Sequence, residues 1–280
     1  MAFTRKKFGL FWSVAPSAQD ISNLELSNVK LVMLPLSLAV HRSDVLTYLS
    51  GRQCKVIIRI DEPLMDSVPV RELRDAVRGV LGVVSLEAVQ LGNEPEHMHD
   101  LRFGSPSWGI DRARHHKHVL ASVRDAVRSL NVRCISPGWT AGRKHELDDL
   151  KPGMIAWRIE VGEEYGKCQG NSGHVYLHEW RHWRDELRFL YQVNELAELW
   201  HLPLWLDEVG VTDGTDVEQM QAYLKMGDML LNPAWPAHHR VECFIPFVSN
   251  GTPGNPPAWN PKYLLQDPEA YRLLGTWVRA

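Results

Sequence analysis

The sequence contains little cysteine, and its four thiols lie far apart along the chain. Zinc ribbons and dithiol redox centres use cysteine pairs at the spacing Cys-x-x-Cys, which does not occur here, so neither kind of site is predicted. The expected state of every cysteine is a buried, reduced thiol. The four are Cys54, Cys134, Cys168 and Cys243.

Long apolar runs are also missing from the sequence. No run approaches the ~18 residues that a membrane-spanning helix needs, so no membrane partner is expected. Residues 1–8 carry two lysines and one arginine, but the segment after them is too short and too polar for the core of a signal peptide. We expect a first strand there and no export in this form, which leaves a cytoplasmic location or release by another route.

Neither sign of charge is in large excess: the formal net charge is −3, and both signs are spread along the chain. Nucleic-acid-binding domains usually carry a basic stripe, and none is visible, so nucleic acid is not an expected partner. The sequence also lacks a glycine-rich phosphate loop, and lysines are scarce at the predicted strand ends. We therefore expect no cofactor.

What the sequence does contain is a regular alternation of short β-rich runs with segments of helical periodicity, which is typical of βα units around a parallel sheet. Eight runs are present, the number that closes a (β/α)8 barrel of ~250 residues. We predict the α/β class, with residues 1–280 forming a single, monomeric (β/α)8 TIM barrel. The runs are Phe8–Val14, Val29–Leu34, Lys55–Asp61, Ala88–Asn93, Val132–Ser136, Val175–Glu179, Leu204–Glu208 and Val241–Val248.

One stretch breaks this alternation. Met154–Val161 is apolar enough to be the sixth strand itself, and it is followed by a polar, glycine-rich segment. We assign the sixth strand to Val175–Glu179 instead. This choice makes residues 154–172 an inserted hairpin or lid.

Two glutamates stand at predicted strand ends. Because side chains alternate along a strand, Glu94 shares a face with Gln90 and Gly92, while the apolar Val89 and Leu91 take the face toward the helices. Glu208 ends the seventh run in the same way. Active sites of such barrels lie at the C-terminal ends of the strands, so both carboxyl groups are expected in the barrel mouth.

This pair suits one kind of chemistry. Cleavage of a glycosidic bond with retention of configuration needs two carboxyl groups ~5–5.5 Å apart, one to protonate the leaving oxygen and one to attack the anomeric carbon. Strands four and seven face each other across a barrel, so Glu94 and Glu208 can converge over its centre.

The residues around both glutamates resemble those of the clan A glycoside hydrolases. Asn-Glu-Pro ends the fourth run at residues 93–95, and Trp-x-x-Glu-x-Gly ends the seventh at residues 205–210. The resemblance implies a retaining glycosidase in which Glu94 is the acid/base and Glu208 the nucleophile. It also implies that Asn93 binds the 2-hydroxyl of the sugar.

Three further residues complete the expected site. His178 and Trp180 are similar to the His-x-Tyr of the clan's sixth strand, with tryptophan in place of tyrosine, so His178 or Tyr176 would have to supply the usual hydrogen bond to the nucleophile. Arg59 shares a face with Asp61 near the end of the third run. It is expected either to keep Glu208 ionised by its proximity or to form a structural pair with Asp61.

Tryptophan is abundant, with 11 residues, and several lie in segments predicted to be loops. Trp139 follows a Pro-Gly turn, and Trp180 stands between two charged residues. Both are therefore expected to offer a ring face to a sugar rather than to pack in the core. Such rings favour a long cleft, endo action and an oligo- or polysaccharide substrate.

The remaining alternatives concern metals and activity. His97 and His99 follow the acid/base directly, but no further ligands are spaced to complete a metal site, so none is predicted. A carbohydrate-binding barrel without catalysis is the alternative function, because a fold does not prove an activity. The presence of both carboxylates argues against it.

Overall fold

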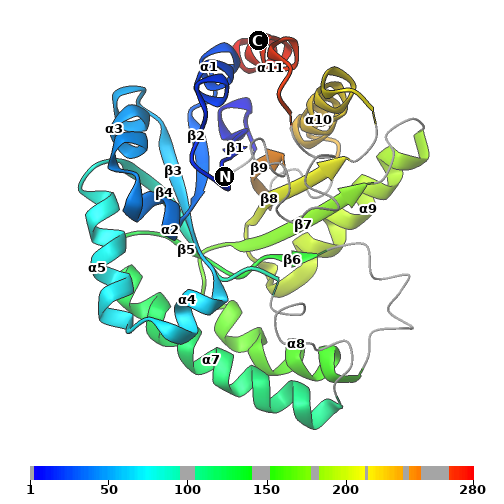
Figure 1. Ribbon diagram of the computed structural model, residues 1–280. Helices are drawn as coiled ribbons and strands as arrows, with labels where there is room; N and C mark the ends of the chain where they lie inside the picture. The colour runs from blue at the N-terminus through cyan, green and yellow to red at the C-terminus, as the bar shows by residue number, and fades with distance from the viewer. Residues whose placement is uncertain are drawn as a thin grey trace.

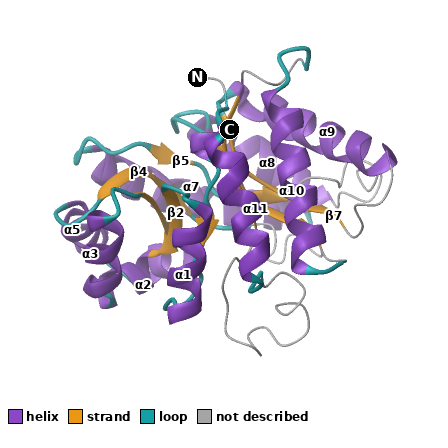
Figure 2. Ribbon diagram, turned by 90° about the horizontal axis from the view of Figure 1, so that it is seen from above, coloured by secondary structure: helices purple, strands orange, loops and turns teal. Residues whose placement is uncertain are grey.

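The computed structural model describes residues 3–94, 105–140, 152–177, 183–211, 214–235, 240–246 and 265–280. Parallel strands form a central ring, and helices surround it on the outside (Figures 1 and 2). The strands are β1 Leu10–Phe11, β2 Leu31–Pro35, β3 Lys55–Ile60, β4 Ser85–Leu91, β5 Cys134–Ile135, β6 Trp139–Thr140, β7 Asn171–Leu177, β8 Leu204–Val211 and β9 Val241–Pro246.

The ring closes through two isolated bridges. Strands β1 to β5 pair in sequence order, and so do β6 to β9. Asn93 bridges to Gly138 between the two sheets, and Phe8 bridges to Phe244 between the first and last strands. Since β5 and β6 are two parts of one barrel strand, interrupted at residues 136–138, the structure confirms the predicted eight-stranded (β/α)8 barrel.

The helices begin where the sequence provides caps. Ser17 with Asp20, and Thr215 with Glu218, form reciprocal capping boxes at the starts of α1 and α10. The helices are α1 Ala18–Ser27, α2 Leu36–His41, α3 Ser43–Gly51, α4 Glu62–Ser67, α5 Val70–Leu81, α7 Pro106–Arg128, α8 Pro152–Tyr165, α9 Trp183–Glu198, α10 Asp216–Leu231 and α11 Pro268–Arg279, with short 3-10 turns at Arg5–Lys7 and Leu199–His201. Within the described residues, no helix is both long and apolar enough to cross a membrane.

Apolar side chains pack in two layers. The larger cluster fills the space between strands and helices, and a smaller one, which includes Phe11, Met33 and Trp205, fills the barrel interior. All four cysteines are buried free thiols, as predicted.

The N-terminal end of the barrel holds a network of charges around Glu87. This residue is the extra one in the β3–β4 register, where Val56 pairs with Leu86 and Ile57 with Ala88. Lys7, Lys55 and Arg133 all contact its carboxylate. Burial alone would raise the pKa of the Glu87 carboxyl. Hydrogen bonds from the lysines and the attraction of their charges outweigh burial and lower this pKa to about 2. This end of the barrel is therefore occupied by a satisfied ion network.

The prediction for residues 154–172 was wrong. Met154–Val161 belongs to α8 rather than to a hairpin or lid, and β7 begins at Asn171, before the predicted sixth strand. Apolar residues lie on more than one side of α8: Trp157 is buried, whereas Ile159 is 77% exposed. Because of this mixed pattern, the sequence of α8 lacks clear helical periodicity. The polar residues at the start of β7 likewise do not resemble a buried strand.

Candidate active site

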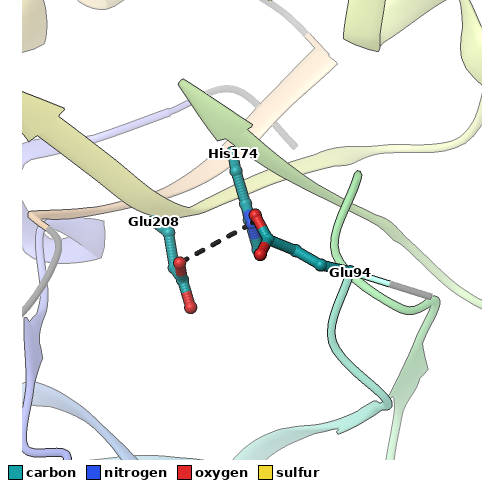
Figure 3. Close-up of side chains that lie close together, drawn as sticks. All are labelled: Glu94, His174 and Glu208. Atoms are coloured by element: carbon teal, nitrogen blue, oxygen red, sulfur yellow. Dashed lines mark hydrogen bonds and ion pairs between the residues drawn. The ribbon is translucent and has the colours of Figure 1, made fainter. Parts of the chain in front are cut away.

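Glu94 and Glu208 meet at the C-terminal ends of the strands. One carboxylate oxygen from each, together with a ring nitrogen of His174, lie within 4.8 Å of one another (Figure 3). Glu94 approaches from the segment after β4 and Glu208 from β8, with the imidazole of His174 between them. This spacing fits the ~5–5.5 Å of a retaining pair and is shorter than the ~6.5–9.5 Å of an inverting pair.

The backbone turns sharply to place Glu94. Gly92 has a φ of 96°, and a Cβ there would lie 2.4 Å from Oε1 of Glu62, so only glycine fits. Glu94 has a φ of 45°, a left-handed conformation that is uncommon for non-glycine residues. It is held by a 3.1 Å hydrogen bond from its amide to the carbonyl of Gly138, and the carboxylate of Glu62 accepts a hydrogen bond from the amide of Asn93. The strand end is thus fixed by two consecutive backbone amides, one bonded to a side-chain carboxylate and the other to a backbone carbonyl.

A β-bulge places two consecutive carboxylates inside the barrel. In the β7–β8 register Gly173 pairs with Leu206, and the next residue, His174, pairs with Glu208, which leaves Asp207 as the extra residue. Asp207 is fully buried and Glu208 is 2% exposed. Simple alternation would point one of these two side chains toward the helices, whereas a bulge re-aims it.

Glu208 is held by two donors. Nη1 of Arg59 lies 2.5 Å from Oε1, and the hydroxyl of Tyr176 donates to Oε2. Arg59 also lies 2.9 Å from Asp61, so it contacts both of the carboxylates with which it was expected to pair. Burial alone would lower the pKa of Arg59, but nearby carboxylates, Glu208 foremost, raise it by more. Arg59 therefore stays charged, and Glu208 faces a permanent cation.

His174 is the main residue that the sequence analysis missed. Its Nδ1 lies 2.9 Å from Oε1 of Glu94 and 3.6 Å from Oε2 of Glu208, while its Nε2 lies 3.7 Å from Oδ1 of Asp207. Burial lowers the pKa of His174, but the charge of Glu208, the hydrogen bond to Glu94 and the charge of Asp207 raise it to about 10. The imidazole therefore carries a positive charge at neutral pH.

A local signal for His174 was present in the sequence. His174-Val175-Tyr176 has the His-x-Tyr spacing that was assigned to residues 178–180, and here the tyrosine is not replaced. Tyr176, one of the two residues proposed to hydrogen-bond the nucleophile, does make that bond. His178 and Trp180 lie outside the described residues, as do His97 and His99.

The break between β5 and β6 makes room for the imidazole. A Cβ at Gly138 would lie 2.1 Å from Nε2 of His174, so this position requires glycine. Asn93, which bridges to Gly138, keeps its buried Oδ1 without a hydrogen-bond partner among the described residues. The predicted contact of Asn93 with a sugar hydroxyl stays a prediction.

Trp139 is not at the cleft surface, and this prediction was wrong. The ring is 1% exposed, packs edge-on against Trp200, and lies under the guanidinium of Arg158 at 4.0 Å. Strand alternation explains the difference, because Gly138 faces the site and the next residue therefore faces the helices. Trp139 is a core residue between β6 and the outer helices.

Replacing Trp139 by alanine is therefore expected to destabilise the protein by about 3–5 kcal/mol, as large-to-small substitutions of buried aromatic residues do. Chemical denaturation of the wild type and the variant measures this difference. The Michaelis constant of the folded fraction is expected to stay unchanged. An unchanged unfolding midpoint together with a raised Michaelis constant would contradict this prediction and would indicate that Trp139 contacts the substrate.

The same three groups could in principle hold a metal ion. Glu94, His174 and Glu208 are the one such cluster found among the described residues. However, Arg59 already occupies Oε1 of Glu208, and the raised pKa of His174 keeps its ring protonated. Metal ligands must be deprotonated, so the cluster suits proton transfer better than cation binding.

Comparison with known proteins supports the fold. No protein-family model and no curated protein matches the chain. Among solved structures, the chain resembles an endo-β-1,3-glucanase of family GH128 subgroup II from Sorangium cellulosum, with a TM-score of 0.60, 14% identity, and coverage of 95% of this chain and 97% of that one. At this identity, the similarity shows a common fold.

Two further structures have the same architecture. A GH128 subgroup I endo-β-1,3-glucanase from Amycolatopsis mediterranei, solved with laminarihexaose, matches with a TM-score of 0.58 and 13% identity, over 96% of this chain and 99% of that one. An endo-β-1,4-mannanase from Thermotoga petrophila matches with a TM-score of 0.56 and 12% identity, over 99% and 76% of the two chains.

Proposed function

We propose that this protein is a retaining glycoside hydrolase, in which a single barrel acts on a β-linked oligo- or polysaccharide. One observation carries the proposal: two carboxylates, within 4.8 Å of each other, converge where barrel enzymes place their active sites. The environments of the two differ. Glu208 is almost fully buried against Arg59 and Tyr176, whereas the side chain of Glu94 is 23% exposed beside His174.

In the first step Glu208 attacks the anomeric carbon. Its carboxylate is the nucleophile because Arg59 and Tyr176 stabilise the charged form and fix its direction. As the new ester bond forms, the bond to the leaving oxygen breaks, and Glu94 donates a proton to that oxygen. The products are a covalent glycosyl-enzyme and the free reducing-end fragment.

In the second step water hydrolyses this intermediate. Glu208 is now an ester and carries no charge, so Glu94 ionises more readily and can accept a proton from the attacking water. The hydroxide attacks the anomeric carbon, the ester bond breaks, and Glu208 is released as a carboxylate. The second inversion restores the original configuration.

The substrate class is proposed from the neighbours in fold, whose names describe β-1,3-glucanases and a β-1,4-mannanase. Incubating the purified protein with a panel of β-glucans and β-mannans, and measuring new reducing ends, tests it. Cleavage of at least one polymer is expected. Binding of a polymer without any cleavage would favour the non-catalytic barrel instead.

Removal of divalent cations is expected to leave turnover unchanged, because carboxyl groups and hydrogen bonds manage the charges that develop in this mechanism. The measurement is the rate of reducing-end release before and after dialysis against a chelator. A loss of rate that a divalent ion restores would contradict the mechanism and would make His97 and His99 candidate ligands.

A further inference from the structure

Asp207 is a buried carboxylate that the two chemical steps do not use. It is fully shielded from solvent, and the hydroxyl of Ser172 donates to both of its oxygens, at 2.6 and 2.7 Å. Gln90 in turn donates to Ser172 at 3.0 Å. Burying a charge lowers the stability of a protein. A buried carboxylate with this chain of contacts across the barrel interior therefore indicates a function for Asp207.

We propose that Asp207 is a positioning residue that holds the His174 imidazole in its charged form between the two catalytic carboxylates. The bulge in β8 provides the geometry, since it turns Asp207 and Glu208 to the same side of the strand. Oδ1 of Asp207 then faces Nε2 of His174 at 3.7 Å, while Nδ1 faces Glu94. The role in catalysis rests on the proposed glycosidase function, whereas the charge state of His174 does not.

The other groups around the imidazole are accounted for. Glu94 faces it from the end of β4 and Glu208 from β8, and the Tyr176 ring lies at 6.3 Å on β7 itself. Arg59 reaches the cluster from β3 through Glu208. The thiol of Cys243 on β9 interacts with Asp207 rather than with the imidazole, and burial raises its pKa well above the ordinary value, so it stays neutral.

The pKa of the Asp207 carboxyl lies close to neutral pH. Burial raises its pKa to about 6, against the attraction of His174 and the hydrogen bond from Ser172, which both lower it. Above that pH the carboxylate is charged and supports the imidazolium. A charged ring that donates from Nδ1 keeps Oε1 of Glu94 as an acceptor, so the proton of the acid resides on its other oxygen.

The sign of the effect follows from electrostatics. Removing the negative charge of Asp207 makes proton loss easier from the neighbouring groups, so the pKa of His174 falls. A pH profile reports these groups as coupled, macroscopic values. The basic limb of the kcat/KM profile, where Asp207 of the wild type is charged, should therefore move to lower pH in Asp207→Asn, by about one unit or more.

The test combines nitrogen NMR of histidine-labelled protein with pH profiles. The His174 signals are identified by their loss in His174→Asn. In the wild type the ring should remain an imidazolium through neutral pH, while in Asp207→Asn it should lose its proton at least about one pH unit lower. Ser172→Ala removes the donor but keeps the carboxylate, which is still charged at the pH where the ring loses its proton, so His174 should titrate close to its wild-type pH.

Glu242→Gln is the matched control, because Glu242 is also buried but is paired at 2.9 Å with Arg133, which belongs to the charge network around Glu87 at the other end of the barrel. It should leave the titration of His174 and the pH profile unchanged. Identical His174 titrations in the wild type and Asp207→Asn, or an equal shift in Glu242→Gln, would overturn the inference. A shifted titration specific to Asp207→Asn in a protein that cleaves no glycan would uphold the role of Asp207 and defeat the proposed function.

Discussion

Replacing Glu208 by glutamine should lower kcat on every glycoside by about four to six orders of magnitude, the scale of loss seen when a nucleophile is removed from a catalytic set. The amide is similar in size and can still accept a hydrogen bond from Tyr176, but it cannot attack the anomeric carbon. Good and poor leaving groups should be affected alike, because no route to the glycosyl-enzyme remains. Initial rates on an activated aryl glycoside and on a polymer measure the effect.

Loss of a buried, arginine-paired carboxylate can also destabilise a protein, so a control is needed. Glu164 is buried and lies 2.6 Å from Arg124, on helix α8 outside the ring of strands. Glu164→Gln should reduce stability but leave turnover intact in the folded fraction. Azide should react in Glu208→Ala in place of the nucleophile and give a glycosyl azide of inverted configuration. Full activity in Glu208→Gln would exclude its role as nucleophile.

Replacing Glu94 by alanine should produce a loss that depends on the leaving group. General acid catalysis contributes about 10²–10⁴-fold, so the rate with a poor leaving group, such as a sugar hydroxyl, should fall by that factor. An activated aryl glycoside needs little protonation, so its first step should be almost unaffected and the glycosyl-enzyme should accumulate. A leaving-group series, analysed as log rate against leaving-group pKa, measures this dependence.

Azide should partly rescue Glu94→Ala by attacking the glycosyl-enzyme in place of activated water. Its product should keep the configuration of the substrate, in contrast to the product expected with Glu208→Ala. Equal losses across the leaving-group series, with no azide product at either position, would overturn the assignment of the two roles.

The barrel and its two glutamates were predictable because each rests on a local pattern. A run such as Lys55–Asp61 is apolar on the face toward the helices. In the fourth run the apolar Val89 and Leu91 mark that face, so alternation predicts that Glu94 points to the opposite side. The side chain of Gln90 does point into the barrel, where it contacts Ser172. Position at a strand end was thus sufficient to predict both glutamates at the barrel mouth, whereas their side-chain directions also depend on the turn at Gly92 and the bulge at Asp207.

The errors share a physical cause: whether the side chains of a strand are polar or apolar depends on residues that are close in space but distant in sequence. β7 begins with Asn171 and Ser172. The side chain of Asn171 contacts Ser136 and the carbonyl of Leu196 on α9, and that of Ser172 donates to Asp207 inside the barrel. Their polarity suggested a loop, so His174 was not considered. The bulge at Asp207 cannot be inferred from alternation, because it is defined by the register with the neighbouring strand.

The tryptophan prediction failed for a similar reason. The Pro-Gly turn before Trp139 offers no local packing, but Arg158 on α8 and Trp200 after α9 cover the ring. Both partners are distant in sequence, and α8 itself had been assigned as a hairpin. Because α8 was not predicted as a helix, the packing of Arg158 against Trp139 could not be predicted either.

Covalent trapping tests the central claim most directly. A β-glycoside with fluorine at carbon 2 and an activated leaving group slows the second step, so the glycosyl-enzyme of a retaining glycosidase accumulates. Peptide mapping by mass spectrometry should place one fluoroglycosyl group on Glu208 in the wild type and none on the Glu208→Gln variant. An adduct on a different side chain, or none in a preparation that steadily hydrolyses the parent glycoside, would contradict the account.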